Sequence, residues 1–115
     1  MDNCIFCKII NGEIPSKVAY EDEFVFAFHD INPIAPVHIL IVPRTHISTL
    51  NDTGPEQKAL LGQMALVCKN LARQYNVDEK GYRFVINCGE DGGQEVQHLH
   101  AHLIGGRPLG DIATG

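Results

Sequence analysis

The sequence predicts an α+β fold in which a largely antiparallel sheet of about five strands packs against one long helix, with a short helix near the N-terminus. Short β-branched or aromatic runs separated by turn residues predict the strands, and one long segment with apolar residues at helical spacing predicts the helix. The chain has 115 residues, of which 44% are hydrophobic, and this is enough apolar material for one core. We therefore expect residues 1–115 to form a single domain.

The N-terminal part of the chain predicts a short helix and three strands. Gly12 stops the helix, and Asp22-Glu23 connects the first two strands as a hairpin. The third strand is almost entirely apolar and β-branched, which is typical of a central position, and Pro43 ends it. The expected bounds are residues 4–11 for the helix and residues 18–21, 24–29 and 37–42 for the strands.

The C-terminal part predicts the long helix and two further strands. Thr53 and Glu56 have the Thr-x-x-Glu spacing of a capping box, so the helix should follow directly and end near Asn76. Its apolar side comprises Leu60, Leu61, Met64, Val67, Cys68, Leu71, Ala72 and Tyr75. The remaining expected elements are strands at residues 82–88 and 96–104, with a loop at residues 90–93 between them.

Charge and hydropathy exclude several classes of protein. The 9 basic and 14 acidic residues give a net charge of −5, and this argues against a nucleic-acid partner because binding to the phosphate backbone requires clustered Lys and Arg. The apolar runs are far shorter than the ~20 residues that cross a bilayer, so we expect no membrane partner. The first residues lack the basic and apolar regions of a signal peptide, and we expect a cytoplasmic protein.

Three alternating histidines are the first candidate for chemistry. On a strand, His98, His100 and His102 would share one face at intervals of ~6.6 Å. A neutral imidazole is a nucleophile, a protonated neighbour can donate to a leaving group, and amides of the Gly92-Gly93 turn could hold an anionic centre. Attack on phosphorus uses all three properties. An exposed or metal-binding histidine face explains the same spacing about equally well.

The cysteines allow two interpretations. In a cytoplasmic chain they are poor candidates for disulfides, and Cys4 and Cys7 form a Cys-x-x-Cys pair. With two further ligands from distant positions, such a pair fits a tetrahedral zinc site. A redox motif is the alternative, although the pair does not follow a strand of a βαβ unit, and Cys68 and Cys88 resemble core residues.

The other histidines have mostly structural explanations. His38 lies inside an apolar strand, where a hydrogen-bonded core histidine is expected. His46 follows a strand end, a position at which sites tend to collect. His29 and Asp30 also lie at a strand end. Asp30 could accept hydrogen bonds from sugar hydroxyls, or it could simply start the turn at Asn32.

The segment His98–Ile104 has the His-φ-His-φ-His-φ-φ pattern and resembles the signature of the histidine triad nucleotide-binding superfamily. The resemblance to its Hint branch extends over residues 4–109. The matching segments are residues 4–10, 13–15, 20–22, 28–31, 36–43, 92–94 and 105–108.

This resemblance implies a role for each histidine of the triad. His100 would attack the α-phosphorus to give a nucleotidyl-histidine, His102 would contact the phosphate, and His98 would support the nucleophile's tautomer or bind metal. The nucleotide-binding residues it implies are Ile5, Phe6, Ile9, Phe28 and Ile31 around a purine base, His29 at the edge of that pocket, Asp30 on the ribose, and Asn87, Gly93, Gln94 and Glu95 along the phosphate.

The resemblance also implies a cofactor and an oligomeric state. Cys4, Cys7, His46 and His98 would hold a structural zinc ion that the chemistry itself does not require. Relatives of this kind form homodimers in which two sheets become continuous. The implied activity is hydrolysis of purine nucleoside phosphoramidates and aminoacyl-adenylate-type compounds. The alternatives are dinucleoside polyphosphate hydrolysis and a nucleotide- and zinc-binding regulatory module with incidental turnover.

Two positions depart from the pattern of many Hint proteins. Glu95 stands where a serine is common, and an ionised carboxylate would repel a phosphate unless it points away or meets a basic leaving group. The tail to Gly115 contains no tryptophan, and the family's C-terminal segment shapes specificity. The preference for a leaving group is therefore open at this point.

Overall fold

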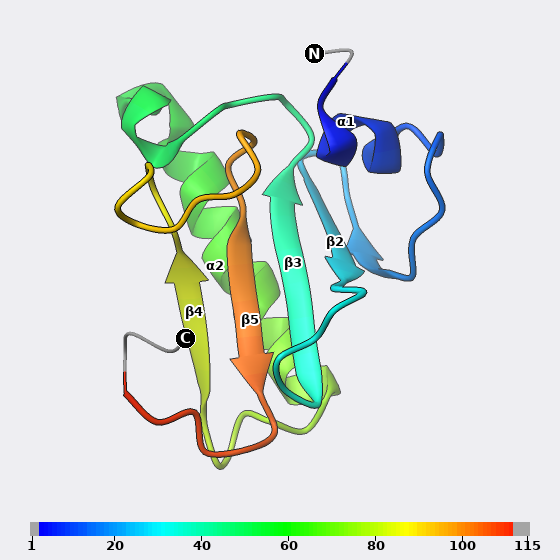
Figure 1. Ribbon diagram of the computed structural model, residues 1–115, viewed down its shortest axis with the longest axis vertical. Coiled ribbons are helices and arrows are strands. Elements are labelled where there is room, and N and C mark those ends of the chain that lie inside the picture. Colours follow the sequence, from blue (N-terminus) through cyan, green and yellow to red (C-terminus); the bar gives the residue numbers. More distant parts are fainter. Residues whose placement is uncertain (1–2, 112–115) are drawn as a thin grey trace.

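The computed structural model describes residues 3–111, so the chain ends at Met1 and Gly115 lie outside the described residues. Within that part no helix is both long and apolar enough to cross a membrane. The elements shown in Figure 1 are α1 (Ile5–Ile10), β1 (Val18–Glu21), β2 (Val25–His29), β3 (Val37–Pro43), α2 (Lys58–Gln74), β4 (Tyr82–Ile86) and β5 (Ala101–Gly105), with two short 3-10 turns at Leu50–Asp52 and Pro55–Gln57.

The strands form one antiparallel sheet in the order β1-β2-β3-β5-β4. The apolar strand β3 is central, as predicted, and its register places Leu40 opposite both Phe28 of β2 and His102 of β5. This confirms the predicted α+β class, with one long and one short helix.

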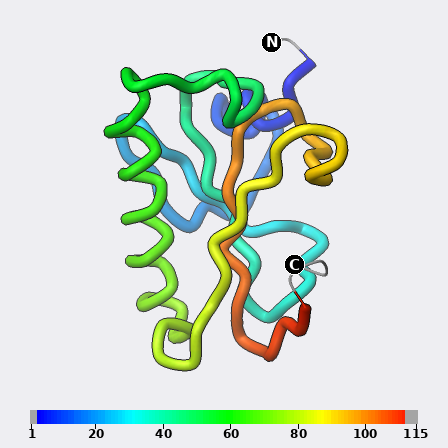
Figure 2. Tube along the Cα trace, turned by 90° about the vertical axis from the view of Figure 1, so that its left-hand side faces the viewer, coloured from blue at the N-terminus to red at the C-terminus, as the bar shows by residue number. Residues whose placement is uncertain are grey.

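The two faces of the sheet carry different layers. Along β3, Ile39 and Ile41 point to the core beneath α2, whereas Leu40 and Val42 belong to a second apolar cluster beside α1. Figure 2 shows α2 along one side of the sheet, and the loops at residues 30–36 and 87–97 on the other side. The even-numbered face of β3 and β5, which carries His102, is therefore the face that α2 leaves uncovered.

The start of the long helix differs from its prediction. The Thr53 hydroxyl donates to the carbonyl of Leu50 and does not cap α2. The capping box lies one turn earlier, where the Thr49 hydroxyl accepts from Asn51 and Asp52 accepts from the backbone of Thr49. Since residues 50–57 form two 3-10 turns, α2 begins only at Lys58.

The last strand is also shorter than predicted. It begins only at Ala101, because residues 96–98 form a bend. The neighbouring strand β4 is also shorter than predicted and ends at Ile86, not at residue 88. The Leu99 N–H donates to the carbonyl of Ile47 at 2.6 Å, a contact with a distant loop that replaces strand pairing at this point. Of the three histidines only His102 is on a strand, so the prediction of one strand face with equal spacing was wrong.

Candidate active site and metal site

His100 and His102 lie side by side on the sheet face opposite α2. Their ring centroids are 5.1 Å apart, and the ring of Phe6 from α1 packs edge-on against His100 at 5.1 Å. His38 of β3 lies on the other side of His102, with the two ring centroids 5.2 Å apart. The side chains of His100, His102 and His38 thus form a row of imidazoles, with Phe6 of α1 packed against one end. The loops at residues 30–36 and 87–97 lie on this side of the sheet (Figure 2).

The hydrogen bonds of His100 determine which nitrogen is free. Its Nδ1 lies 2.7 Å from the carbonyl oxygen of His98. Because a carbonyl only accepts, this Nδ1 carries the proton, and the neutral ring presents an unprotonated Nε2. His100 is 6% exposed, so the lone pair on Nε2 is held in one direction in a largely water-free setting.

A chain of hydrogen bonds sets the opposite tautomer in His102. The Ile34 N–H donates to Nδ1 of His38 at 3.2 Å, so a neutral His38 carries its proton on Nε2. That Nε2–H lies 2.9 Å from Nδ1 of His102 and donates to it. His102 must then carry its own proton on Nε2. The site therefore places an imidazole acceptor, Nε2 of His100, next to an imidazole donor, Nε2–H of His102.

Burial keeps these rings neutral. It lowers the pKa of His100, although Asp30 and Glu95 oppose the shift electrostatically. Burial also lowers the pKa of His102 to about 4, with further lowering from His100 and His38. His38 has a pKa lowered by burial and partly restored by Asp30. At neutral pH the row is uncharged, as a nucleophile beside a hydrogen-bond donor requires.

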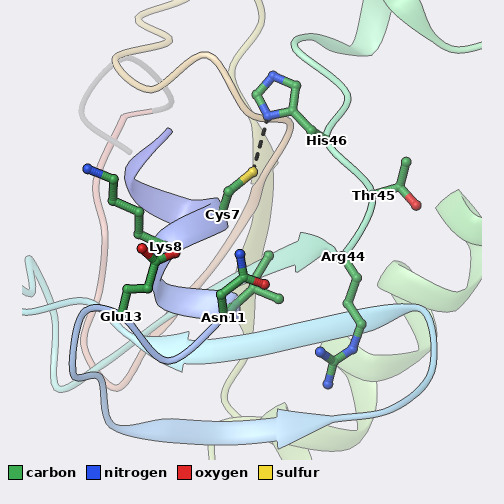
Figure 3. Close-up of a pocket in the computed structure, with 8 residues that line it drawn as sticks. Cys7, Lys8, Asn11, Glu13, Arg44, Thr45 and His46 are labelled. Atoms are coloured by element: carbon green, nitrogen blue, oxygen red, sulfur yellow. Dashed lines mark hydrogen bonds between the residues drawn. The ribbon is translucent and has the colours of Figure 1, made fainter. Parts of the chain in front are cut away.

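A second cluster joins the N-terminal segment to the sheet. The ligand atoms of Cys4, Cys7, His46 and His98 all lie within 4.8 Å of one another. Nδ1 of His98 lies 3.3 Å from Sγ of Cys4 and 3.6 Å from Sγ of Cys7, and Nδ1 of His46 lies 3.4 Å from Sγ of Cys7. Figure 3 shows the contact between Cys7 and His46.

The geometry of this cluster fits zinc. In a tetrahedral site with Zn–S of about 2.3 Å and Zn–N of about 2.0–2.1 Å, sulfur and nitrogen ligands are about 3.5 Å apart. The observed separations of 3.3, 3.4 and 3.6 Å match that edge length. Nε2–H of His98 donates to the carbonyl of Pro43 at 2.9 Å, which leaves its Nδ1 free to bind a cation.

The metal-ligand cluster and the row of imidazoles are linked through His98. His98 contributes its side chain to the cluster, and its carbonyl accepts from Nδ1 of His100. Burial and the neighbouring side chain of Cys4 raise the pKa of the Cys7 thiol to about 11, so a bound cation would have to displace that proton. Contacts that hold the side chain of His98 therefore also hold its carbonyl oxygen, which orients the ring of His100.

The residues predicted around the base fall into two groups. Phe6, Ile9 and Phe28 are buried in the apolar cluster beside α1. Ile5 is 46% exposed and Ile31 is 88% exposed. The first group forms an apolar floor next to His100, and the second group projects from α1 and from the loop after β2, where a flat ring could cover it.

His29 and Asp30 point in different directions. Nε2 of His29 lies 3.0 Å from the hydroxyl of Tyr75, near the end of α2, so its side chain lies on the opposite sheet face from Phe28 and away from His100. One oxygen of Asp30 accepts from the Asn32 N–H at 2.8 Å, which is the predicted turn role. Its other oxygen lies 3.5 Å from Nε2 of His38.

The loop expected along the phosphate is held mainly by its own hydrogen bonds. Gln94 is buried, and its amide donates to the carbonyls of Ser48 and Val96 and accepts from the N–H of Gly89. The Gly93 N–H donates to Glu90 within the turn. These hydrogen bonds anchor the loop that the sequence analysis placed along the phosphate. Asn87 donates to Gly92, and the side chain of Glu95 is exposed.

His38 is the residue whose place in the site the sequence did not reveal. It is buried and hydrogen-bonded, as expected, but its partner is His102. The spacing from His38 to Leu40 placed it on one face of β3, but the register that aligns Leu40 with His102 comes from long-range pairing. No local pattern carries that information.

Comparisons with known proteins agree with this geometry. The HIT domain family matches residues 11–109. A protein of Escherichia coli (strain K12) named "Purine nucleoside phosphoramidase" is 50% identical over 111 residues, which are 96% of this chain and 93% of that protein. The crystal structure of a HIT family hydrolase from Legionella pneumophila Philadelphia 1 is 47% identical, with a TM-score of 0.93, over 98% of this chain and 100% of that chain.

A more distant relative shares the fold as well. The histidine triad nucleotide-binding protein from Candida albicans is 37% identical with a TM-score of 0.84, over 93% of this chain and 77% of that chain. The chain therefore belongs to the HIT family. This confirms the resemblance inferred from His98–Ile104.

Proposed function

We propose that this protein hydrolyses the phosphorus–nitrogen bond of purine nucleoside phosphoramidates through a nucleotidyl-histidine on His100. The observation that carries the proposal is the unprotonated Nε2 of His100 beside the Nε2–H of His102, on one face of the sheet. The name of the Escherichia coli relative, purine nucleoside phosphoramidase, supports the same reaction.

In the proposed mechanism Nε2 of His100 attacks the α-phosphorus, and the phosphorus–nitrogen bond breaks. The amine leaves with its electron pair and takes up a proton, while Nε2–H of His102 donates to the oxygens on which negative charge accumulates. Water then attacks the nucleotidyl-histidine, gives up a proton and releases the nucleoside monophosphate with His100 restored. His38 acts as a positioning residue, because it fixes the tautomer of His102.

The remaining roles are part of the same proposal. The purine base lies on Phe6, Ile9 and Phe28, between the exposed side chains of Ile5 and Ile31. The Asp30 oxygen that faces His38 accepts from a ribose hydroxyl. Asn87 and Glu95 lie near the phosphate and leaving group, whereas Gln94 and Gly93 act by holding the loop.

We also infer a structural zinc ion held by Cys4, Cys7, His46 and His98, supported by the ligand spacing and by the hydrogen bond from His98 to Pro43. When bound, zinc ties the N-terminal segment to the sheet, and the reaction needs no cofactor. Elemental analysis of protein purified without a metal-affinity tag should give about one zinc per chain. Less than half an equivalent would contradict this assignment.

The proposal extends to the domain organisation, the assembly and the compartment of the protein. We propose one domain over the whole chain and a homodimer with joined sheets, supported by Phe84, which is 39% exposed on the edge strand β4, and by Leu66, 54% exposed on α2. Light scattering should give twice the chain mass. We propose a cytoplasmic protein, in keeping with four cysteines that form no disulfide among the described residues.

Steady-state kinetics test the function against its alternatives. We expect turnover of an adenosine phosphoramidate with kcat/KM well above that for a diadenosine polyphosphate. A preference for the polyphosphate would favour the dinucleoside polyphosphate hydrolase. Binding of a nucleoside monophosphate without turnover of either compound would favour the regulatory module.

A further inference from the structure

The two cysteines of the metal cluster also form a compact dithiol. Cys4 is the N-cap of α1, and its sulfur accepts a hydrogen bond from the N–H of Cys7 at 3.3 Å. Both sulfur atoms belong to the group whose ligand atoms lie within 4.8 Å of one another. Both side chains are partly exposed, whereas Cys68 is 1% exposed in the core.

Two cavities reach this dithiol from different sides. A cavity of about 670 Å³ is lined by Cys7 and His46 together with Lys8, Asn11 and Arg44 (Figure 3). A second cavity of about 480 Å³ is lined by Cys4 and His46. Small polar molecules can therefore approach each sulfur, while His98 remains fully buried behind them.

We propose that Cys4 and Cys7 are a modification site at which hydrogen peroxide or a small hydroperoxide forms an intramolecular disulfide and releases any metal ion that the two sulfurs hold. The metal-release part rests on the proposed zinc site. The thiol chemistry depends neither on zinc nor on the proposed hydrolase activity.

The reaction balances with the peroxide as the only oxidant. One thiolate attacks the O–O bond, which gives a sulfenic acid and expels hydroxide. The second sulfur gives up its proton as it attacks the sulfenic acid sulfur, forms the S–S bond and releases water. The two sulfurs lose two electrons in total and the peroxide gains them. The Cys-x-x-Cys spacing at the start of a helix suits this closure, because positions three residues apart lie on the same side of the first turn.

The modification has a consequence for the catalytic row. A disulfide removes both sulfurs as metal ligands, and the Nδ1 of His98 then loses the cation that would hold it. Since the carbonyl of His98 accepts from Nδ1 of His100, loosening His98 disturbs the nucleophile. Loss of such supporting contacts around a metal site costs about 10–100-fold in activity. We expect kcat to fall by at least tenfold, with KM changed by less than about threefold.

The test uses the full chain loaded with zinc. The protein is treated with hydrogen peroxide in the presence of a chromogenic chelator, and zinc release, free thiols and peptide masses are followed together. We expect release of zinc in step with the loss of two thiols, a disulfide that maps to Cys4 and Cys7, and recovery of both thiols with a reductant. The Cys88→Ser variant should behave in the same way, whereas Cys7→Ser should form no intramolecular disulfide.

Several results would overturn the proposal. They are oxygen addition at Cys4 or Cys7 without a disulfide, a disulfide that involves Cys88, thiols at both positions that stay reduced, and zinc retained after both thiols are lost. If the chain holds no zinc, the thiol and mass readouts decide the modification alone. An unchanged kcat in fully oxidised protein would refute the link to His100. Absence of turnover in reduced protein would refute the proposed function and leave the thiol readouts intact.

Discussion

Replacing His38 tests whether the tautomer of His102 matters for turnover. In His38→Leu the Nδ1 of His102 loses its donor at 2.9 Å, so the proton of His102 is no longer confined to Nε2. In His38→Gln an amide N–H can reach the same atom, because the Nε2 atoms of glutamine and histidine lie at similar distances from the backbone. The two variants therefore differ mainly in the hydrogen bond.

The size of the effect follows from the cost of that bond. Leaving a buried acceptor without its donor costs about 1–3 kcal/mol, and about 1.4 kcal/mol changes a rate tenfold. We expect kcat of His38→Leu to fall by about 10–100-fold with KM changed by less than about threefold, because ground-state contacts remain. The kcat of His38→Gln should fall by less than about fivefold, since the glutamine amide replaces the missing hydrogen-bond donor.

The assay is steady-state hydrolysis of an adenosine phosphoramidate, with thermal unfolding measured alongside to confirm that both variants fold. Equal losses in the two variants would show that His38 acts through packing alone. An unchanged kcat in His38→Leu would refute the assigned hydrogen-bond chain from Ile34 to His102.

Three other perturbations have expected outcomes. Because burial lowers the pKa of His102 from its ordinary value of 6.5 to about 4, the free energy of unfolding that is present above pH 6.5 decreases as the pH drops toward 4. At pH 5 the decrease in the free energy of unfolding is at most about 2 kcal/mol. Urea unfolding of His102→Gln should not show this decrease. Glu95→Gln should favour anionic over cationic leaving groups by about threefold to fivefold in kcat/KM, since one exposed charge contributes about 1 kcal/mol; an unchanged ratio would place Glu95 away from the leaving group. Gly92→Ala would bring a Cβ to 2.3 Å from the carbonyl oxygen of Cys88, so thermal unfolding should show a destabilisation of about 1–3 kcal/mol. Gly62→Ala, whose Cβ meets nothing within 4 Å on α2, should instead stabilise by about 0.5–1 kcal/mol, and the opposite order would contradict the steric reading of Gly92.

The elements that the sequence predicted well are those specified by local periodicity. Apolar spacing along α2 and the β-branched run of β3 each follow from a few neighbouring residues. The bounds of β3 agree with the structure to within one residue, whereas α2 begins only at Lys58. Thr53 does not cap α2, because the capping box forms at Thr49 instead. Several neighbouring residues are suitable caps, and the local sequence does not decide among them. Alternation at residues 96–100 failed because Ile47 supplies the hydrogen-bond partner of Leu99.

The sequence predicted which residues form the site, but it did not predict the hydrogen bonds between them. The triad pattern identified His98, His100 and His102, and the resemblance grouped Cys4 and Cys7 with His46 and His98, which the structure brings together. Some hydrogen bonds that assign protons to the rings are local, such as those from Ile34 to His38 and from His100 to the carbonyl of His98, but those of His102 and His98 join residues far apart in the chain. The distant partners are the ring of His38 for His102 and the carbonyl of Pro43 for His98. Such pairings arise from strand register, which no single segment encodes.

In the proposed mechanism, Nε2 of His100 forms a covalent bond to phosphorus. Rapid mixing with an adenosine phosphoramidate, alkaline quenching and peptide mass mapping measure this directly. We expect a transient adduct of one nucleoside monophosphoryl group on His100 in the unmodified protein, and none in His100→Ala, which should still bind the nucleotide. An adduct on His98 or His102, or full turnover by His100→Ala, would contradict the mechanism.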